Sequence, residues 1–285
     1  DISPTSGQMP RLLGLAMASK HFRSGKFNSE KLSNNGNEIA WGTIGNASTS
    51  EGLFFETVNA IGVHQVPAII SIWDDDYGIS VDNSYQTTKS SISEALKGFQ
   101  RNNTKKGFEI LTVNGWDYPK LISTYEHANN IARNEHVPVI IHVKELTQPV
   151  GHSTSGSHER YKSKDRLDWE KIYDCNVKMK EWILENGLFT SKELDKVHNE
   201  CKEFVKKQKE IAWTSFQSQI LSERNSLMEI LKNIIQTEKS HDLIEITNSL
   251  IRLKEVGRKD LMSTARKILR SKLSEQSFIK LSNWI

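Results

Sequence analysis

The chain has 285 residues, which is enough for one large or two modest domains with a buried core. Hydrophobic residues make up 36% of it and charged residues 26%, as is ordinary for a soluble globular protein. Because the net charge is only +3 and no apolar run approaches the length of a membrane helix, we expect neither a nucleic acid nor a membrane as a partner.

The two cysteines, Cys175 and Cys201, lie in helical-looking segments and lack the spacing of a metal or redox motif. This usage is typical of a reduced, intracellular protein. We therefore expect a cytoplasmic location, or the mitochondrial matrix in a eukaryote. The chain begins at Asp1 in the middle of a motif, so we expect it to be a piece of a longer protein.

The first predicted elements alternate between helix and strand. A helix over residues 11–20 precedes a polar loop over 22–38 and a strand over 39–44. Apolar residues at helical spacing then predict a helix over 53–61. Pro67 precedes the apolar run 68–73, which is typical of a buried strand, and the acidic turn Asp74-Asp75-Asp76 follows it.

The alternation continues as far as residue 143. The pattern predicts a short helix over 91–99, a strand over 108–113, a helix over 118–135 that Asp117 caps, and a strand over 137–143. Strands that alternate with helices predict an α/β fold with a mostly parallel sheet flanked by helices. Later segments are helical. We therefore predict an α/β domain over 1–164 and a helical C-terminal extension over 165–285.

The turn Gly45-Asn46-Ala47-Ser48 joins the first predicted strand to the next helix. Its small side chains let the backbone approach a ligand closely. In such a unit, strand ends and helix N-termini meet at one edge of the sheet, where α/β proteins bind anionic cofactors. The sequence therefore predicts an anion-binding edge at this turn.

These turns resemble the thiamine diphosphate signature in the alpha subunit of the decarboxylating component of 2-oxo-acid dehydrogenases. That signature opens with Gly-Asp-Gly, continues Ala-Thr-Ser-Glu-Gly, and closes some two dozen residues later with Asn-Asn-Gly-Tyr-Ala-Ile-Ser. The resemblance implies the thiamine diphosphate-binding fold. This chain reads Gly45-Asn46-Ala47-Ser48-Thr49-Ser50-Glu51-Gly52 and then, with 26 residues (48–73) between Ala47 and Asp74, Asp74-Asp75-Asp76-Tyr77-Gly78-Ile79-Ser80.

A metal site is implied by the same resemblance. In the family, the opening acid and the second closing amide bind the metal that holds the cofactor's diphosphate. Here the two residue types have changed places, as Asn46 and Asp75. One carboxylate and one amide carbonyl, with the backbone carbonyl of Tyr77, keep the oxygen donors that Mg²⁺ prefers. The competing interpretation is a solvated acidic turn in a site that no longer binds metal.

Further cofactor contacts are implied residue by residue. The segment over 2–10 resembles the part of the family that lies against the aminopyrimidine ring of the cofactor. The implied cofactor-binding residues are Ser3, Thr5, Gly45, Asn46, Ala47, Ser48, Tyr77, Gly78 and His152.

A loop over 148–162 is dense in hydroxyl and turn-forming residues and resembles the family's active-site loop, Gly-His-His-Ser-Thr-Ser. His152 falls on the active-site histidine of that loop. Histidine suits the role because imidazole gains and loses a proton near neutral pH, so it can donate to phosphate and assist proton movement. Ser153 matches the serine that regulatory kinases phosphorylate in some relatives.

Three residues of this loop depart from the family pattern. Gln148 and Lys162 stand where the family has arginines, and Gly156 stands where it has an aspartate that helps to order the loop. We therefore expect the loop to be less ordered in the absence of a partner subunit.

The resemblance implies oxidative decarboxylation of a 2-oxo acid by thiamine diphosphate and Mg²⁺, with acyl transfer to a lipoyl group. The sequence of the loop is more similar to that of branched-chain enzymes than to that of pyruvate enzymes. The implied partners are a beta subunit or fused beta half and a lipoyl-bearing acyltransferase, in a homodimer or an α2β2-type assembly.

The family's activating glutamate lies on the beta subunit, so we expect these 285 residues alone to bind the cofactor weakly and to be inactive. The alternative function is a non-catalytic alpha-type scaffold that has lost metal and cofactor binding. A dinucleotide-binding domain is disfavoured, because its glycine pattern is absent from the sequence.

Overall fold

The computed structural model describes residues 4–25, 31–152 and 157–285. The chain forms two compact units, Asp1–Thr190 and Ser191–Ile285, which we call the sheet unit and the helical unit. The sheet unit contains the strands β1 (Ala40–Gly45), β2 (Ala68–Trp73), β5 (Glu109–Asn114) and β6 (Val139–Lys144), the short strands β3 (Tyr77–Gly78) and β4 (Val81–Asp82), and the helices α1 (Met9–Arg23), α2 (Gly52–His64), α3 (Ile92–Ala95), α4 (Tyr118–Asn130), α5 (Lys164–Ile172) and α6 (Cys175–Glu185).

The central sheet has four parallel strands in the order β1-β2-β6-β5. β2 and β6 are the inner strands and are almost continuously buried, which explains their runs of isoleucine and valine. Each predicted strand is present within one or two residues of its predicted bounds. The prediction of an α/β fold with a parallel sheet is therefore confirmed.

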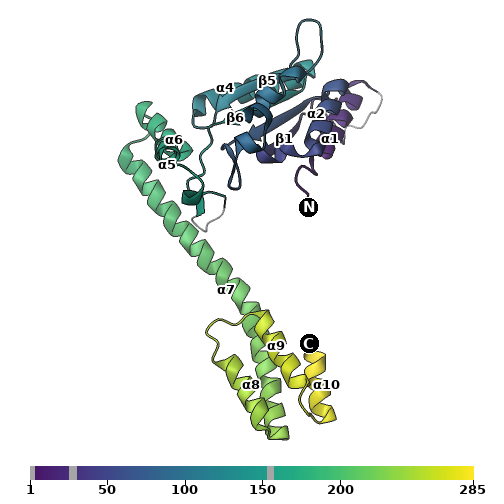
Figure 1. Ribbon diagram of the computed structural model, residues 1–285, viewed down its shortest axis with the longest axis vertical. Coiled ribbons are helices and arrows are strands. Elements are labelled where there is room, and N and C mark those ends of the chain that lie inside the picture. The colour runs from purple at the N-terminus through teal and green to yellow at the C-terminus, as the bar shows by residue number, and fades with distance from the viewer. Residues whose placement is uncertain (1–3, 26–30, 153–156) are drawn as a thin grey trace. The chain divides into compact units, whose positions relative to one another are not determined.

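Helices cover both faces of the sheet (Figure 1). α1 and α2 pack on one face, where Leu12 and Phe54 join a buried cluster with Ile70 of β2. On the opposite face, Ala128 of α4 packs in a second cluster with Ile69, the neighbouring residue of β2. Successive side chains of a strand point to opposite faces, so a single buried strand supplies both cores.

The start of α4 follows the predicted capping. The Asp117 carboxylate accepts a hydrogen bond from the Lys120 amide, 3.1 Å away, and so caps α4. α6 ends just before Gly187, which takes a φ of +63° that is open to glycine at little cost.

The sheet unit extends beyond the domain boundary predicted at residue 164. The ring of Trp116 lies 5.2 Å from that of Tyr173 in the turn after α5, and the ring of Tyr118 lies 5.2 Å from that of Trp182 in α6. Because these contacts hold α5 and α6 against the start of α4, the compact unit ends after α6. The extent of the cofactor-binding segment itself stays a prediction.

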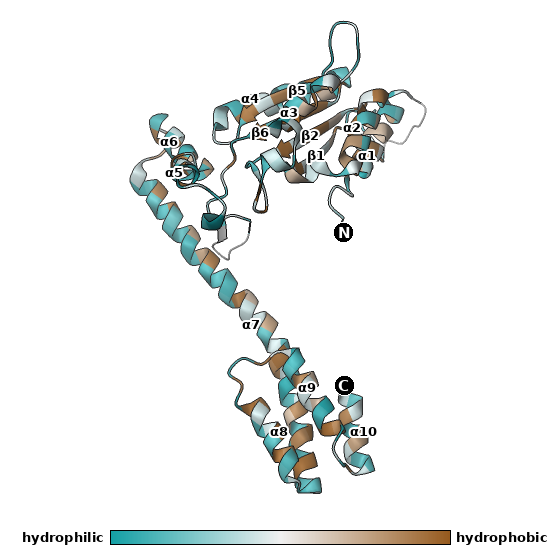
Figure 2. Cartoon of the chain, in the orientation of Figure 1, coloured by the Kyte–Doolittle hydropathy of each residue, from teal (hydrophilic) through white to brown (hydrophobic). Residues whose placement is uncertain are grey.

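The helical unit confirms the predicted C-terminal helices. The second half of α7 (Ser191–Glu238) packs with α8 (His241–Ile251), α9 (Arg258–Leu269) and α10 (Glu275–Trp284), and their apolar stripes face one another (Figure 2). Among the described residues, no helix is both long and apolar enough to cross a bilayer. The buried core of this unit consists of Ile220, Leu227, Leu231, Ile234, Leu243, Leu250, Val256, Leu261, Ala265, Ile268 and Leu281.

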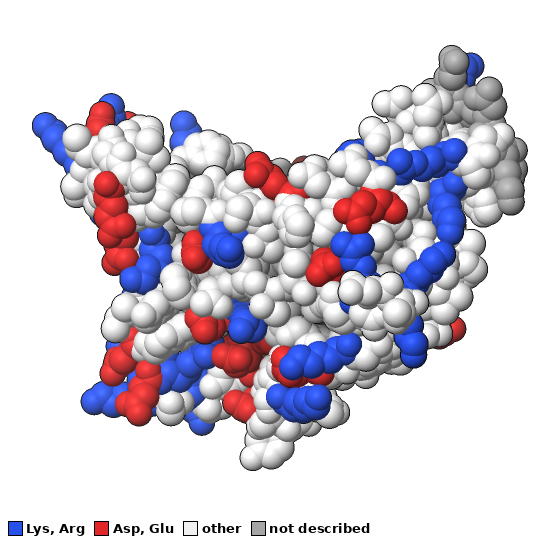
Figure 3. All heavy atoms as spheres, turned by 90° about the horizontal axis from the view of Figure 1, so that it is seen from above, with Lys and Arg blue, Asp and Glu red and all other residues white. Residues whose placement is uncertain are grey.

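Charged side chains of both signs are interspersed on the face seen in Figure 3. Exposed ion pairs also occur in the chain, such as that of Lys171 with Asp168 at 2.8 Å on α5. This mixed pattern agrees with the small net charge of the chain.

Candidate cofactor site

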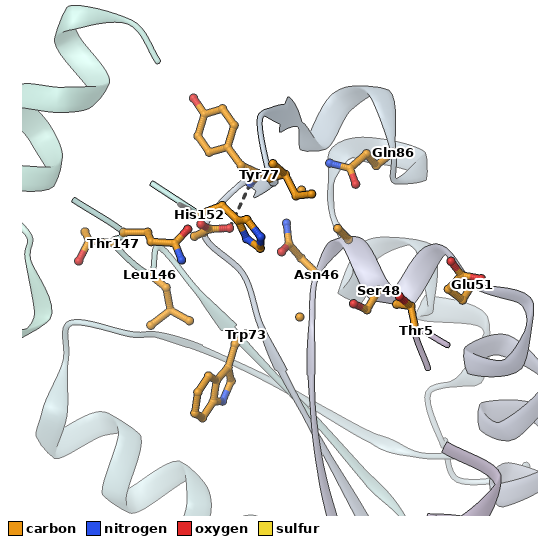
Figure 4. Close-up of a pocket in the computed structure, with 16 residues that line it drawn as sticks. Thr5, Asn46, Ser48, Glu51, Trp73, Tyr77, Gln86, Leu146, Thr147 and His152 are labelled. Carbon is orange, nitrogen blue, oxygen red and sulfur yellow. Dashed lines mark hydrogen bonds between the residues drawn. The ribbon is translucent and has the colours of Figure 1, made fainter. Parts of the chain in front are cut away.

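A cavity of about 770 Å³ lies at the carboxyl edge of the sheet, between the turns that follow β1 and β2 and the loop that follows β6 (Figure 4). Because the strands are parallel, their following loops meet at this edge. Every predicted site residue that the structure describes lines the cavity, whereas Ser3 and Ser153 lie outside the described residues. The cavity is lined by Thr5, Gly45, Asn46, Ala47, Ser48, Glu51, Trp73, Asp75, Tyr77, Gly78, Ile79, Gln86, Leu146, Thr147, Gln148 and His152.

Asn46 presents an unused hydrogen-bond donor at this cavity. Its backbone amide donates to the carbonyl of Trp73, 3.0 Å away, and its carbonyl accepts from the Thr49 amide and hydroxyl. The side chain is only 4% exposed, and its Nδ2 has no hydrogen-bond partner among the described residues. An unsatisfied buried donor costs about 1–3 kcal/mol, so this amide fits a ligand that brings an acceptor oxygen.

The N-terminal segment contacts the same turn. The Ser6 hydroxyl donates to the carbonyl of Ser48 at 2.7 Å. This bond holds Thr5, the preceding residue, at the cavity wall.

Asp74 organises the acidic turn after β2. This buried carboxylate accepts hydrogen bonds from the Asp76 amide at 2.8 Å and from the Asn83 side chain at 3.3 Å. His142 of β6 donates to it from Nε2 at 2.8 Å, while Nδ1 of the same ring lies 2.9 Å from the Ser93 hydroxyl. Asp74 is therefore used in holding the backbone, which leaves Asp75 to line the cavity.

Asp75 is a partly buried carboxylate with little compensation. It accepts a hydrogen bond from the Tyr77 amide at 3.2 Å, and among the described residues it forms no ion pair within 4 Å. Burial raises the pKa of the Asp75 carboxyl and the charge of Asp74 adds to this rise, although the Tyr77 amide and Lys162 lower it. A carboxylate in this position fits a bound cation.

Gly78 is held in close contact with the turn after β1. A Cβ at this position would lie 2.6 Å from the Cβ of Ala47 and 2.3 Å from the side-chain oxygen of Gln86. Gln86 is itself tied by a 2.6 Å hydrogen bond to the carbonyl of Val81. The absence of a side chain at Gly78 therefore lets the two turns that border the cavity pack together.

The loop after β6 brings His152 to the cavity, and its ring is exposed there. Gly151 takes a φ of +69°, and a Cβ on it would lie 2.7 Å from the Tyr161 hydroxyl. The backbone of His152 hydrogen bonds to the same hydroxyl. Tyr161 thus fixes the approach of the chain to His152.

A buried ionic network follows this loop, and the sequence prediction missed it. Lys162 and Glu170 are both buried, with Lys162 Nζ 2.7 Å from a Glu170 oxygen. The same carboxylate accepts from Arg166 at 2.9 Å. Lys162 also donates to the carbonyl of Gln148 at 3.1 Å, so it joins the two ends of the loop. In the sequence, the four-residue spacing of Arg166 and Glu170 suits an ion pair on one helix face and could have predicted this part of the network.

Carboxylate, cysteine and histidine ligands alone do not make a metal centre here. Within residues 4–25, 31–152 and 157–285, no group of three or more His, Cys, Asp or Glu side chains has the geometry of a metal site. A cation at Asp75 would therefore take its other ligands from amide or backbone oxygens or from a bound phosphate, as Mg²⁺ commonly does.

A family model described as "Dehydrogenase E1 component" matches residues 2–220. The chain belongs to this family. The predicted resemblance to the E1 component is thereby confirmed. The match ends at residue 220, near the start of the helical unit's core, so α8, α9 and α10 all lie outside it.

Several curated relatives of this E1 chain are alpha subunits. It is 25% identical over 213 residues to the pyruvate dehydrogenase E1 component subunit alpha of Rickettsia bellii, covering 73% of this chain and 57% of that one. It is also 25% identical over 188 residues to the 2-oxoisovalerate dehydrogenase subunit alpha of Bacillus subtilis, covering 66% and 51%. The chain thus spans about half the length of the curated relatives it matches.

Among solved structures, a transketolase from Campylobacter jejuni aligns with this E1 chain at a TM-score of 0.40 and 18% identity. The alignment covers 61% of this chain and 26% of the transketolase.

Proposed function

We propose that this chain supplies the metal- and diphosphate-binding part of a thiamine diphosphate-dependent 2-oxo-acid dehydrogenase. The reaction is the oxidative decarboxylation of a 2-oxo acid, with transfer of the acyl group to a lipoyl group. Membership of the E1 family supports the reaction class. The observation that carries the proposal is the meeting of Asn46, Asp75 and Gly78 at one cavity, with a spare amide donor and an unpaired carboxylate.

These residues fit the cofactor and its metal in kind. Asn46 Oδ1, the Asp75 carboxylate and the Tyr77 carbonyl would hold Mg²⁺, and the orphaned Asn46 Nδ2 would donate to a diphosphate oxygen. Gly45 and Gly78 would let the backbone approach the cofactor closely. Compared with the family's signature, the amide and the acid have exchanged positions. This exchange would keep one negative charge among the protein ligands, so the protein would balance the metal's charge as in the family.

The other side chains position and exchange protons. When bound, thiamine diphosphate supplies the nucleophilic carbon and the electron sink that decarboxylation needs. His152 would donate a hydrogen bond from its ring to a diphosphate oxygen and carry a proton during acyl transfer. The close contact between Gly151 and Tyr161 would restrain the backbone next to His152 and so limit the movement of its ring.

The substrate we favour is a branched-chain 2-oxo acid over pyruvate. Besides the loop sequence, the apolar side chains of Trp73, Leu146 and Ile79 line the cavity, and they suit an aliphatic substituent. The Trp73 indole is held by a 3.0 Å hydrogen bond to the Ser71 hydroxyl. A comparison of kcat/KM for 3-methyl-2-oxobutanoate and pyruvate tests this preference, and a higher value for pyruvate contradicts it.

Because the chain spans only part of its relatives, the assembly is also a proposal. We infer a beta subunit or a fused beta half as partner, in a homodimer or an α2β2-type enzyme, and a lipoyl-bearing acyltransferase as acceptor. In this arrangement the chain alone binds the cofactor weakly and does not turn over. Decarboxylation by the isolated 285-residue chain would refute that expectation.

Calorimetry tests the proposed function directly. Thiamine diphosphate is titrated into the protein with its partner, in the presence and absence of Mg²⁺. We expect saturable, Mg²⁺-dependent binding that Asp75→Ala abolishes and that Asp168→Asn, on the exposed surface of α5, leaves unchanged. No binding heat under any condition would instead support a non-catalytic scaffold.

A further inference from the structure

Arg166 of α5 ties the acidic turn to the network that follows the His152 loop. Its Nη1 donates to the Asp76 carboxylate, and its Nη2 donates to the backbone carbonyl of Asp75 at 2.9 Å. Its Nε donates to Glu170 at 2.9 Å. One side chain thus contacts two consecutive residues of the turn and one residue of its own helix.

The guanidinium is held rigidly between these partners. Its central carbon lies 4.7 Å from the ring centre of Trp169 and 5.6 Å from that of Tyr77, and the side chain is 17% exposed. Because the planar guanidinium is already stacked on aromatic rings, it loses little further conformational entropy when its edges form hydrogen bonds to the turn.

The turn needs such a restraint because part of its backbone lies outside the common conformations. Asp76 has a φ of +69°, in the left-handed region, which aspartate tolerates better than most residues but adopts less readily than glycine. Its amide is held by the Asp74 carboxylate, and its own carboxylate is held by Arg166. Removal of either contact would let Asp76 return to an ordinary conformation and turn Asp75 away from the cavity.

Glu170 extends the restraint to the His152 loop. Its carboxylate accepts hydrogen bonds from Arg166 and from the buried Lys162, and Lys162 also donates to the carbonyl of Gln148. The Asp75 turn and the two ends of the His152 loop therefore share one buried carboxylate.

We propose that Arg166 is a positioning residue that fixes the Asp75 carboxylate for the metal and, through Glu170, couples this turn to the loop that carries His152. The metal part of this inference rests on the proposed function. The mechanical part concerns only contacts within the chain and is tested separately.

Hydrogen exchange tests the mechanical part on the 285-residue chain without cofactor. In Arg166→Met, we expect the amides of Asp76 and Tyr77 to exchange at least about tenfold faster than in the unchanged chain. Lys171→Met, on the same helix but in an exposed ion pair, should leave both rates unchanged. Unchanged exchange in a folded Arg166→Met variant overturns the proposal. If Arg166→Met does not fold, Arg166→Lys, which cannot contact the turn in two places, is judged by the same criterion.

Mn²⁺ binding tests the metal part, with thiamine diphosphate present and the partner subunit added. We expect Arg166→Met to weaken Mn²⁺ binding by about 10- to 100-fold, as is usual when a residue that orients a ligand is lost. Arg166→Lys should recover only part of the affinity, because a lysine cannot contact the turn in two places. Unchanged affinity in Arg166→Met overturns the coupling to the metal. Failure of the unchanged protein to bind Mn²⁺ refutes the proposed function and the metal part together, while the exchange result still decides the mechanical part.

Discussion

The ammonium of Lys162 lies 2.7 Å from a carboxylate oxygen of Glu170, and both side chains are at most 2% exposed. A buried ion pair is costly to break from one side, and Lys162→Met leaves the buried Glu170 carboxylate with Arg166 as its remaining partner among the described residues. We expect Lys162→Met to lower the free energy of unfolding of the sheet unit by about 3 kcal/mol, measured by urea denaturation.

The double variant Lys162→Met/Glu170→Met provides the control for this prediction. It removes both charges, so its loss of stability should be smaller than that of Lys162→Met alone. Lys171→Met, which breaks only an exposed pair, should change stability by less than about 1 kcal/mol. A double variant that is less stable than the single one would contradict a stabilising role through charge pairing.

Gly78→Ala should disrupt the cofactor site without a large loss of stability. The new methyl group meets the Cβ of Ala47 at 2.6 Å, so the two turns must separate. We expect Mg²⁺-dependent binding of thiamine diphosphate to weaken at least about tenfold in calorimetry. Gly14→Ala is the matched control, because a methyl group there meets nothing within 4 Å, and in the middle of α1 it should raise stability by roughly 1 kcal/mol. Equal cofactor affinity in the two variants would show that the contact between the turns is dispensable.

Asp75→Asn should make the cofactor-free protein more stable at pH 7. Burial raises the pKa of the Asp75 carboxyl, so the folded state disfavours the charged form of this side chain, and asparagine removes that cost. We expect a melting temperature about 2–4 °C higher per kcal/mol gained. Addition of Mg²⁺ and thiamine diphosphate should then stabilise the unchanged protein and not the variant.

Asp82→Asn is the comparison of opposite sign. The pKa of Asp82 is lowered by hydrogen bonds from the Ser84 side chain and amide, so loss of its charge should destabilise the protein. If both asparagine variants shift the melting temperature in the same direction, the explanation by local environment fails.

His136 should make the sheet unit less stable in mild acid. Burial lowers the pKa of His136, and the charges of Arg23 and Lys20 lower it further. The folded state therefore prefers the neutral ring. Its contribution to stability is complete above the unfolded pKa of about 6.5 and is lost as the pH falls below that value.

The variant His136→Asn isolates this effect. Asparagine tolerates the φ of +54° at this position and does not titrate. Between pH 7.5 and pH 5, we expect the unchanged protein to lose more unfolding free energy than the variant in urea denaturation. Parallel curves for the two proteins would assign the acid sensitivity to other groups.

Much of the sheet unit was predictable because its strands and helix starts are specified by short local sequence patterns. Short, largely apolar runs predicted β2 and β6, Pro67 marked the start of a strand, and Asp117 marked the start of a helix. The parallel sheet followed from the alternation of strands and helices. The gathering of Asn46 and Asp75 at one cavity followed from motif spacing and from the common edge of parallel strands.

The contacts that stabilise the site were not predictable from the same patterns. Nothing in the sequence indicates that Lys162 is buried, and as a replacement for an arginine it suggested a looser loop. Its partner Glu170 lies about two turns into α5, a helix whose charged sequence predicts that it is exposed to solvent. Likewise, Asp74, Asp75 and Asp76 are identical in type, and only the tertiary contacts with His142 and Arg166 give each carboxylate a different task.

Each buried cluster in this chain draws its side chains from a single unit. Heating should therefore give two melting transitions, and a single midpoint does not describe the molecule. Of the seven tryptophans, five (41, 73, 116, 169 and 182) belong to the sheet unit and two (213 and 284) to the helical unit. Intrinsic fluorescence will consequently be dominated by the sheet unit, while the far-ultraviolet helical signal will report strongly on the helical unit.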